Sequence, residues 1–140
     1  MTPRYYEILN QINNSTSKEE VINILTHTSH NFREFLKLAF DPTIKFYPKA
    51  FPPNYKKPDT LPGVSFSDLN VEMKRIYLFQ IGNPIADSIT EEKRNILLLQ
   101  MMESLEPEEA TTLINLFNKN LKIKNLTYKL IKEVFPNLLP

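Results

Sequence analysis

The scarcity of glycine is the strongest constraint on the fold of this chain. Only Gly63 and Gly82 occur among 140 residues. Tight β-hairpin turns need glycine for positive φ angles, and phosphate-cradling loops need it for close backbone approach. The composition therefore disfavours a hairpin-built sheet, a Walker loop and a dinucleotide-binding loop, and it favours helices.

Apolar residues recur three and four positions apart along most of the chain, as they do on one face of an amphipathic helix. No useful length alternates with period two. The prediction is an all-α orthogonal bundle of about seven helices, forming a single domain over residues 1–140. The expected helices run from 3 to 13, 17 to 27, 31 to 40, 67 to 81, 88 or 90 to about 102, 107 to 118, and 125 to 134.

Polar residues mark several helix ends. Thr2 is a candidate cap for the first helix, with Pro3 at its first position. Ser17 and Glu20 form a candidate capping box, and Asn125 is a candidate cap for the last helix. In the fifth helix, the residues expected to face inward are Ile96, Leu97, Leu99, Met101 and Met102.

A proline-rich segment, residues 42–65, interrupts the helical pattern and holds six of the eleven prolines. Long segments without regular structure are uncommon inside compact domains. This segment also carries aromatic residues that can clamp it onto the helices. We therefore expect an ordered, extended loop, anchored by Phe46, Tyr47, Phe51 and Tyr55.

The sequence contains no motif that is typical of a catalytic site or a metal site. There is no cysteine, and His27 and His30 supply only two ligands, so a polar turn is the simplest interpretation. The acids Glu106, Glu108 and Glu109 suit either a divalent ion or, more simply, the positive end of a helix. We expect no enzyme, no catalytic residue, no metal and no cofactor.

The chain also shows no membrane or export signal. No apolar run approaches the roughly 20 residues needed to span a bilayer, and the N-terminus has no signal-peptide core. We expect a cytoplasmic protein with no membrane partner and no small-molecule substrate.

Positive charge is segregated although the net charge is only +1. Residues 115–140 hold Glu133 as their single acid against five lysines, which are Lys119, Lys122, Lys124, Lys129 and Lys132. Lysines gathered on one surface bind phosphates by releasing counterions. The simpler alternative is a solvated lysine face. Short polar side chains nearby suit phosphate contacts or caps: Asn118, Asn120, Asn125 and Thr127.

A second basic group precedes and enters the proline-rich segment. Its members are Arg33, Lys37, Lys45 and Lys49. Phe46 and Tyr47 lie among them, and basic residues interleaved with aromatics can grip a sugar-phosphate backbone. The alternative is that Phe46 and Tyr47 anchor the loop in the core, and for Phe46 this is the favoured interpretation.

Three stretches carry a resemblance to a known family. They are EILNQI at 7–12 followed by STSK at 15–18, LKLAFDPTIKFY at 36–47, and the ending NLKI at 120–123, TYKLI at 127–131 and VFPNLLP at 134–140. With this order and spacing, the chain resembles the N-terminal DNA-binding domain of ATP-dependent DNA ligases, most closely those of T-even-type phages.

The resemblance implies a helical module that grips duplex DNA around a nick through backbone and minor-groove contacts. It implies a surface made of Lys37, Lys45, Lys119, Lys122 and Lys124. The nucleotidyltransferase domain and its Lys-x-Asp-Gly motif are missing, so a free-standing module, encoded by a phage and acting in the infected host cell, is expected.

The chain departs from the ligase pattern at three places. Lys119-Asn120 replaces an arginine-acid pair, residues 122–125 lack the usual turn glycine, and Asn137 replaces a glycine in the tail.

Two functions follow as hypotheses. The first is a non-catalytic, sequence-independent protein that binds duplex DNA, nicked or intact, in phage replication, repair or recombination. The alternative is an adapter that docks on a replication or transcription component such as a sliding clamp or polymerase. The adapter would need an exposed apolar patch around Tyr47, Phe51 and Tyr55.

Overall fold

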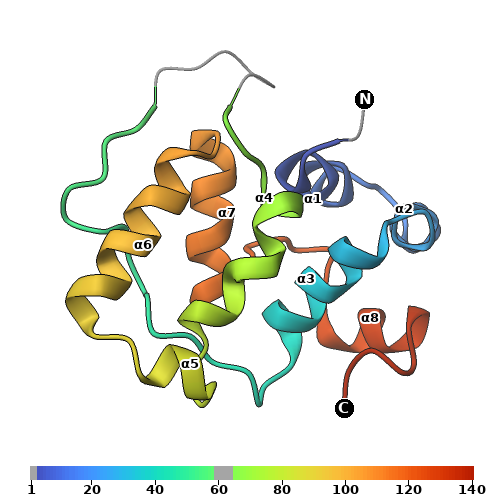
Figure 1. Cartoon of the computed structure of the whole chain (residues 1–140). Coiled ribbons are helices and arrows are strands. Elements are labelled where there is room, and N and C mark those ends of the chain that lie inside the picture. The colour runs from blue at the N-terminus through green and yellow to red at the C-terminus, as the bar shows by residue number, and fades with distance from the viewer. Residues whose placement is uncertain (1–2, 59–64) are drawn as a thin grey trace.

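The computed structural model describes residues 3–58 and 65–140. Regular structure in these residues is helical throughout, with eight α-helices and one 3-10 helix, and the all-α prediction is confirmed. The elements, in chain order, are α1 (Tyr5–Asn13), α2 (Lys18–Thr26), α3 (His30–Phe40), α4 (Leu69–Glu72), the 3-10 helix η1 (Met73–Phe79), α5 (Pro84–Asp87), α6 (Glu91–Glu103), α7 (Pro107–Phe117) and α8 (Tyr128–Val134) (Figure 1).

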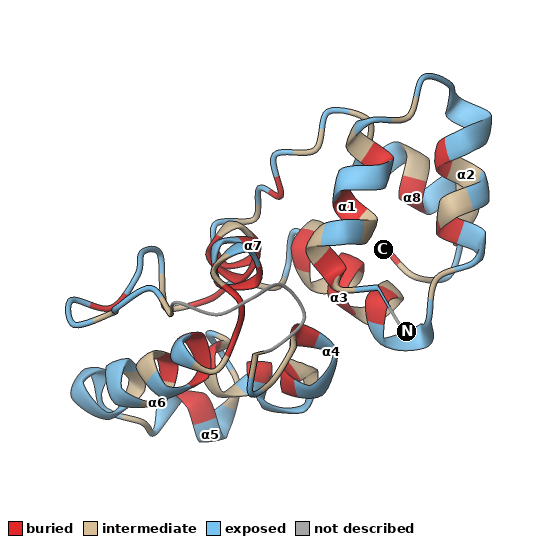
Figure 2. Ribbon diagram, turned by 90° about the horizontal axis from the view of Figure 1, so that it is seen from above, coloured by how far each residue is buried: buried red, intermediate tan, exposed pale blue. Residues whose placement is uncertain are grey.

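Helix α7 lies at the centre of the molecule. Figure 2 shows α1, α2, α3 and α8 on one side of it and α4, α5 and α6 on the other. Most of its circumference is buried, which is typical of a core helix. The buried apolar positions predicted for it are confirmed: Ala110, Leu113, Ile114 and Phe117.

Aromatic side chains pack helices of one side together and pack other segments onto α7. The Tyr5 ring meets the Phe32 ring edge-on, with centroids 5.0 Å apart. On α7, the Phe117 ring centroid lies 5.1 Å from that of Phe46 and 5.6 Å from that of Phe79 in η1. Phe46, which comes from the proline-rich segment, is fully buried, so its interpretation as a core anchor is confirmed.

The proline-rich segment is fastened by backbone hydrogen bonds as well. The Tyr47 amide donates to the Phe79 carbonyl at 2.9 Å, and the Ile81 amide donates to the Lys45 carbonyl at 2.8 Å. These bonds use groups that a continuing helix would need. The helix predicted over 67–81 is therefore replaced by the single turn of α4 and by η1, which ends at Phe79.

Other boundaries differ for local reasons. The short helix α5 was not predicted; it follows Gly82, whose φ of 91° redirects the chain, and Asn83 caps it. In α6, several apolar residues follow one another, so the sequence does not show which of them face the core. The buried residues of α6 are Leu98, Met101 and Met102, whereas Ile96 is half exposed.

The predicted caps are only partly correct. Helix α1 begins at Tyr5 with Arg4 as its cap, so Pro3 precedes the helix, and Thr2 lies outside the described residues. The Ser17 hydroxyl accepts from the Glu20 amide at 3.2 Å, as predicted.

The remaining caps use different partners from those predicted. The Glu20 carboxylate accepts from the Thr16 amide and hydroxyl rather than from Ser17. Thr127 rather than Asn125 caps α8, because its hydroxyl accepts from the Leu130 amide at 3.1 Å.

A buried charged cluster joins α1, α4 and α7. The Arg4 guanidinium lies 3.0 Å from the Asp68 carboxylate, 3.6 Å from Glu106 and 3.7 Å from Glu109. The Tyr6 hydroxyl donates to Glu106 at 2.6 Å. Glu106 and Glu109 were predicted as ordinary first-turn acids, but both are buried and share one guanidinium.

Glu109 has the least solvated charge in this cluster. One carboxylate oxygen accepts from the Leu69 amide at 3.0 Å, and the other has no hydrogen bond in the described part of the chain. Burial raises the pKa of Glu109 to about 7, although the Leu69 amide and Arg4 oppose the rise. The residue therefore takes up a proton near neutral pH.

We predict that the protein is more stable at pH 5 than at pH 7.5. A carboxyl with a folded pKa above its unfolded value stabilises the fold below the unfolded pKa, and this stabilisation is lost as the pH rises through the folded pKa. Glu109→Gln should remove this part of the pH dependence. Urea unfolding at both pH values measures it, and an equal pH dependence in both proteins would contradict the assignment.

Within residues 3–58 and 65–140, no helix is long and apolar enough to span a bilayer.

Candidate nucleic-acid interface

The connection from α7 to α8, residues 118–127, begins with a left-handed turn. The Asn120 amide donates to the Asn115 carbonyl at 3.0 Å, and the Lys119 amide donates to the Leu116 carbonyl at 2.9 Å. This pair of bonds is the Schellman arrangement that ends many helices. Lys119 occupies its left-handed position with a φ of 59°, where glycine is usual.

The Lys119 side chain is half-buried, and its ammonium is bound to protein backbone. Its ammonium donates to the carbonyl of Leu38 and, at 2.9 Å, to that of Asp41, at the end of α3. A cation at this place satisfies exposed helix carbonyls and the helix dipole. Burial lowers the pKa of Lys119 to about 8, and the Asp41 charge opposes the change. The Lys119 ammonium, which was predicted to contact phosphate, instead caps the end of α3.

Lys122 adopts a second left-handed conformation, with a φ of 61°. Its amide donates to the Asn120 side chain at 3.0 Å, which closes a small turn. The side chain is exposed, and its ammonium makes no hydrogen bond or ion pair with the described residues. The turn therefore presents a free lysine at a strained backbone position.

Asn125 fixes the far end of the connection. Its side-chain amide donates to the carbonyls of Ile12, Asn13 and Ser15 at 2.9, 3.3 and 3.1 Å, at the end of α1. The Lys124 amide donates to the Asn13 side chain at 3.4 Å, while the Lys124 side chain is exposed. Both exposed lysines thus sit on a connection that is tied at each end.

The second basic group adjoins this connection. The Lys49 ammonium donates to the Phe117 carbonyl at 3.0 Å, and the Asn118 side chain donates to the Lys49 carbonyl at 2.9 Å. Lys45 is exposed nearby in sequence, and Lys37 is half-buried in the last turn of α3. The end of α7 and the proline-rich segment are therefore neighbours, although about 70 residues separate them.

We call the exposed lysines of these two segments the lysine surface; its members are Lys45, Lys49, Lys122 and Lys124. Asp41 is the only acid in residues 35–58 and 115–132, and it is buried. Burial alone would raise the pKa of Asp41, but hydrogen bonds from Thr43 and the charges of Lys119 and Lys37 outweigh it and lower that pKa. The Asp41 carboxylate is thus ionised and engaged by Thr43.

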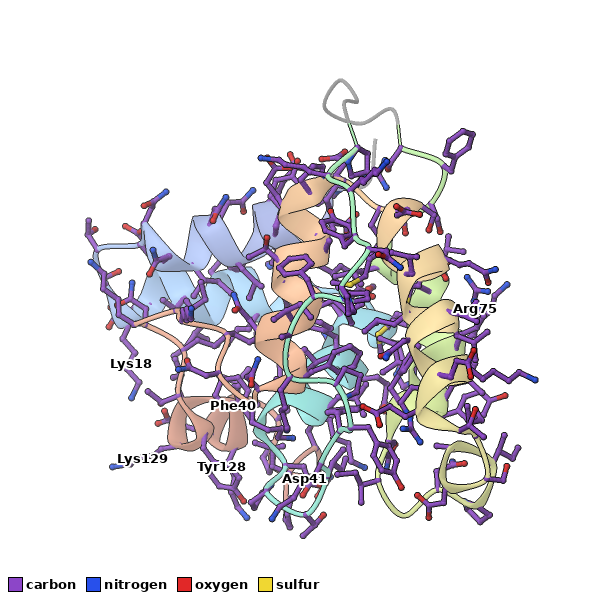
Figure 3. The ribbon with its side chains drawn as sticks, turned by 90° about the vertical axis from the view of Figure 1, so that its left-hand side faces the viewer. Lys18, Phe40, Asp41, Arg75, Tyr128 and Lys129 are labelled. Atoms are coloured by element: carbon purple, nitrogen blue, oxygen red, sulfur yellow. The ribbon has the colours of Figure 1, made fainter. Side chains whose placement is uncertain are left out.

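Two predicted site residues lie elsewhere. The Arg33 guanidinium sits 4.6 Å from the Phe135 ring centroid and donates to the Thr26 carbonyl at 3.1 Å, so it ties α2, α3 and α8 together. Lys129 is exposed, and Figure 3 shows it projecting from α8 into solvent, away from Asp41. Lys132, on the same helix, donates to the Pro140 carbonyl at 2.7 Å.

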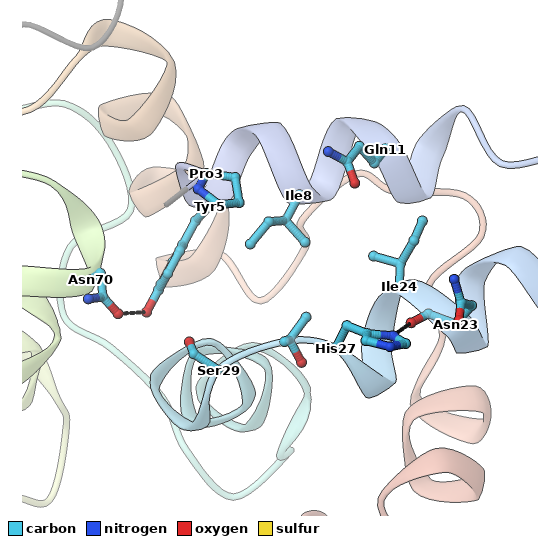
Figure 4. Close-up of a pocket in the computed structure, with 10 residues that line it drawn as sticks. Pro3, Tyr5, Ile8, Gln11, Asn23, Ile24, His27, Ser29 and Asn70 are labelled. Atoms are coloured by element: carbon cyan, nitrogen blue, oxygen red, sulfur yellow. Dashed lines mark hydrogen bonds between the residues drawn. The ribbon is translucent and has the colours of Figure 1, made fainter. Parts of the chain in front are cut away.

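A separate hollow of about 440 Å³ lies among α1, α2 and α4 (Figure 4). At its edges the Tyr5 hydroxyl donates to the Asn70 side chain at 3.0 Å, and a ring nitrogen of His27 lies 2.7 Å from the Asn23 carbonyl. The described residues that line it include no acid, lysine or arginine. His27 faces backbone and His30 lies 3.8 Å from Glu34, so the two histidines have separate partners.

A model of a protein family of unknown function, DUF6433, matches residues 8–123. The chain belongs to this family. The match takes in Lys119 and Lys122 and ends before α8. No curated protein matches the DUF6433 chain.

A solved structure named Pmar-Lig_PreS3 has a similar fold. It aligns with a TM-score of 0.68 over 99% of the DUF6433 chain, at 19% identity. The DUF6433 chain spans 32% of that structure's length. At this identity the likeness shows the fold alone, and it agrees with the predicted ligase-domain-like bundle.

The sequence offered no signal for the structural roles of Lys119 and Arg4. Both are single charged residues, and their partners come from distant segments. The asparagines did carry a signal, since Asn118, Asn120 and Asn125 suited either caps or phosphate contacts. In the DUF6433 fold each hydrogen-bonds protein backbone.

We predict that Lys119→Met destabilises the fold by about 2 kcal/mol, because the Leu38 carbonyl at the end of α3 loses the ammonium as its donor, whereas the Asp41 carbonyl keeps the Ile44 amide. Methionine keeps the stem and the left-handed strain, so the change isolates the ammonium. Lys124→Met removes an exposed lysine and should cost less than about 0.5 kcal/mol. Urea unfolding compares them, and equal costs would show that the ammonium does not cap α3.

We predict that Lys122→Gly stabilises the fold by about 0.5–1 kcal/mol, since glycine tolerates the positive φ that strains lysine. Lys124→Gly is the control, because Lys124 has no positive φ. It removes the same side chain and should destabilise through added chain entropy. Thermal unfolding orders the two variants, and the reverse order would rule out strain at Lys122.

Proposed function

We propose that this protein is a non-catalytic module that binds duplex DNA without reading its sequence. The lysine surface makes the contact. The observation that supports this most directly is the junction at Lys49, Phe117 and Asn118, where two basic segments distant in the sequence adjoin. Asp41, the one acid within these segments, is buried and engaged by Thr43.

The charges of this surface act locally. The net charge is +1, so the whole molecule exerts little long-range attraction. Charges more than about 8–10 Å apart are screened at physiological salt. Four lysines on phosphates would give a slope of log affinity against log salt of about −3.6. The contacts are lysine to phosphate, which positions a protein on DNA without specifying a sequence.

The fold supports the same function. The neighbour Pmar-Lig_PreS3 is, by its name, ligase-related, and the sequence resembles the DNA-binding domain of phage ligases. Among the described residues, no group of three or more His, Asp or Glu residues could hold a metal ion. We therefore place the protein in phage DNA replication, repair or recombination as a binder of nicked or intact duplex rather than an enzyme.

We predict that the double charge reversal Lys122→Glu with Lys124→Glu weakens duplex binding about tenfold or more, because it replaces phosphate attraction by repulsion. Fluorescence anisotropy with nicked and intact duplexes of two unrelated sequences measures the loss across a salt titration. The loss should be alike on both sequences.

The matched control reverses Lys74 and Lys93, which are exposed residues of η1 and α6 outside the lysine surface. It makes the same change in net charge and should alter the affinity by less than about twofold. Equal losses in the two double variants would leave only a net-charge effect. An unchanged affinity in Lys122→Glu with Lys124→Glu would remove the connection 118–127 from the interface.

The alternative is an adapter that docks on a sliding clamp or polymerase. Of the expected patch, only Phe51 is more than a third exposed. A different site suits this function better: a hollow of about 540 Å³ between α3 and η1, whose lining includes the exposed Val71 and Tyr77. Salt-insensitive copurification with such a component, without DNA retention, would favour the adapter.

A further inference from the structure

We propose that a hollow beside the lysine surface binds one unpaired base of the DNA, with Phe51 as its stacking platform. The inference rests on the proposed function and adds a preferred substrate, which is a duplex with an adjoining unpaired nucleotide. The hollow has a volume of about 350 Å³. Residues 47–53 form one wall and the first turns of α6 form the other.

The proline-rich wall is rigid and presents an aromatic ring. Pro48, Pro52 and Pro53 restrict its backbone. Phe51 is 38% exposed, and its ring is stacked on that of Tyr55, with centroids 4.8 Å apart and an angle of 30° between the planes. One face of Phe51 is therefore supported by protein, and the ring is held in place to accept a base on its open side.

The opposite wall carries a fixed cation. The Arg94 guanidinium lies 3.8 Å from the Tyr47 ring centroid and donates to the carbonyls of Ala86 and Ile89 at 3.2 and 3.0 Å. The Tyr47 hydroxyl is bound in turn to Asp87. This network orders Arg94 and Tyr47 without a ligand, so a bound strand would not have to pay for ordering them.

The chemistry of the lining fits a nucleotide. Its charged members are Lys49 and Arg94, with Glu91 opposing them at the start of α6. Asn95 offers both amide donors and an acceptor to a base edge. The buried Leu98 forms an apolar part of the lining. Bases stack on aromatic residues whatever their identity, in keeping with sequence-independent binding.

Continuity with the lysine surface identifies the occupant. Lys49 belongs to both places, because it lines the hollow and its ammonium lies on the Phe117 carbonyl next to the connection 118–127. A strand on the lysine surface is therefore led toward Phe51. The volume is near the lower limit of about 300 Å³ for ligand sites, which suits one nucleoside and not a protein helix.

The test compares a blunt duplex with the same duplex carrying a short single-stranded tail, using anisotropy at fixed salt and the full chain. Wild type should bind the tailed DNA about 5- to 100-fold more tightly, as one stacked base provides. Phe51→Ala should bind both DNAs equally, at the wild-type affinity for the blunt duplex. Phe66→Ala removes a ring that is 97% exposed and outside the hollow, and it should keep the preference.

Phe51→Trp gives a second measurement that does not depend on an affinity difference. The chain has no tryptophan, so the substitution introduces a single indole reporter. Its fluorescence should be quenched by the tailed DNA and not by the blunt duplex, because a stacked base quenches indole.

The outcomes separate the two proposals. Failure of the wild type to bind the blunt duplex overturns the proposed function. Normal blunt binding with no gain from the tail overturns the base site alone. A preference that survives Phe51→Ala, or a Phe51→Trp signal that the tail leaves unchanged, also overturns the base site.

Discussion

The Lys119 ammonium is the contact on which the arrangement of the lysine surface depends. It joins the end of α7 to the end of α3 by donating to the Leu38 and Asp41 carbonyls. The backbone at Lys119 is left-handed, and this conformation turns the side chain's own segment back toward α3. Lysine carries a steric cost there that glycine would avoid, and the buried hydrogen bonds of the ammonium offset it. Next to it, the Lys49 and Asn118 side chains join the proline-rich segment to the start of the connection 118–127.

Basic residues of this protein divide into structural and available ones. Lys119, Arg33 and Arg94 hold helix ends and aromatic rings through their hydrogen bonds. Lys45, Lys122 and Lys124 have exposed side chains without a protein partner in the described part of the chain, whereas Lys49 is exposed and its ammonium also donates to the Phe117 carbonyl. Counting positive charges along the chain overestimates the binding surface, because part of the charge is used in packing. The positive charge that remains available for binding is small and local, in keeping with the net charge of +1.

The acids near α7 show the same division. Glu106 and Glu109 would be ordinary acids at a helix start if α7 lay at the surface. Because α7 is central, they are buried instead and share Arg4 with Asp68. These charges therefore join α1, α4 and α7. The cost of removing them from water is only partly compensated by their mutual attraction.

The sequence was enough to establish the class of fold, because apolar spacing and the lack of glycine are local properties that leave few options besides helices. It also indicated most helices, the Ser17 cap and the burial of Phe46. It did not reveal the break in the helix predicted over 67–81, since the Lys45–Tyr47 backbone that competes for those groups lies more than 30 residues away.

Which lysines are free depends on long-range packing and is visible only in the folded protein. Lys119 and Lys122 look alike in the sequence, yet the Lys119 ammonium is partly buried against α3 carbonyls, whereas the Lys122 side chain is exposed. Their difference comes from the direction in which the turn after α7 points each side chain. That direction depends on long-range packing against α3 and α1, which no local pattern encodes.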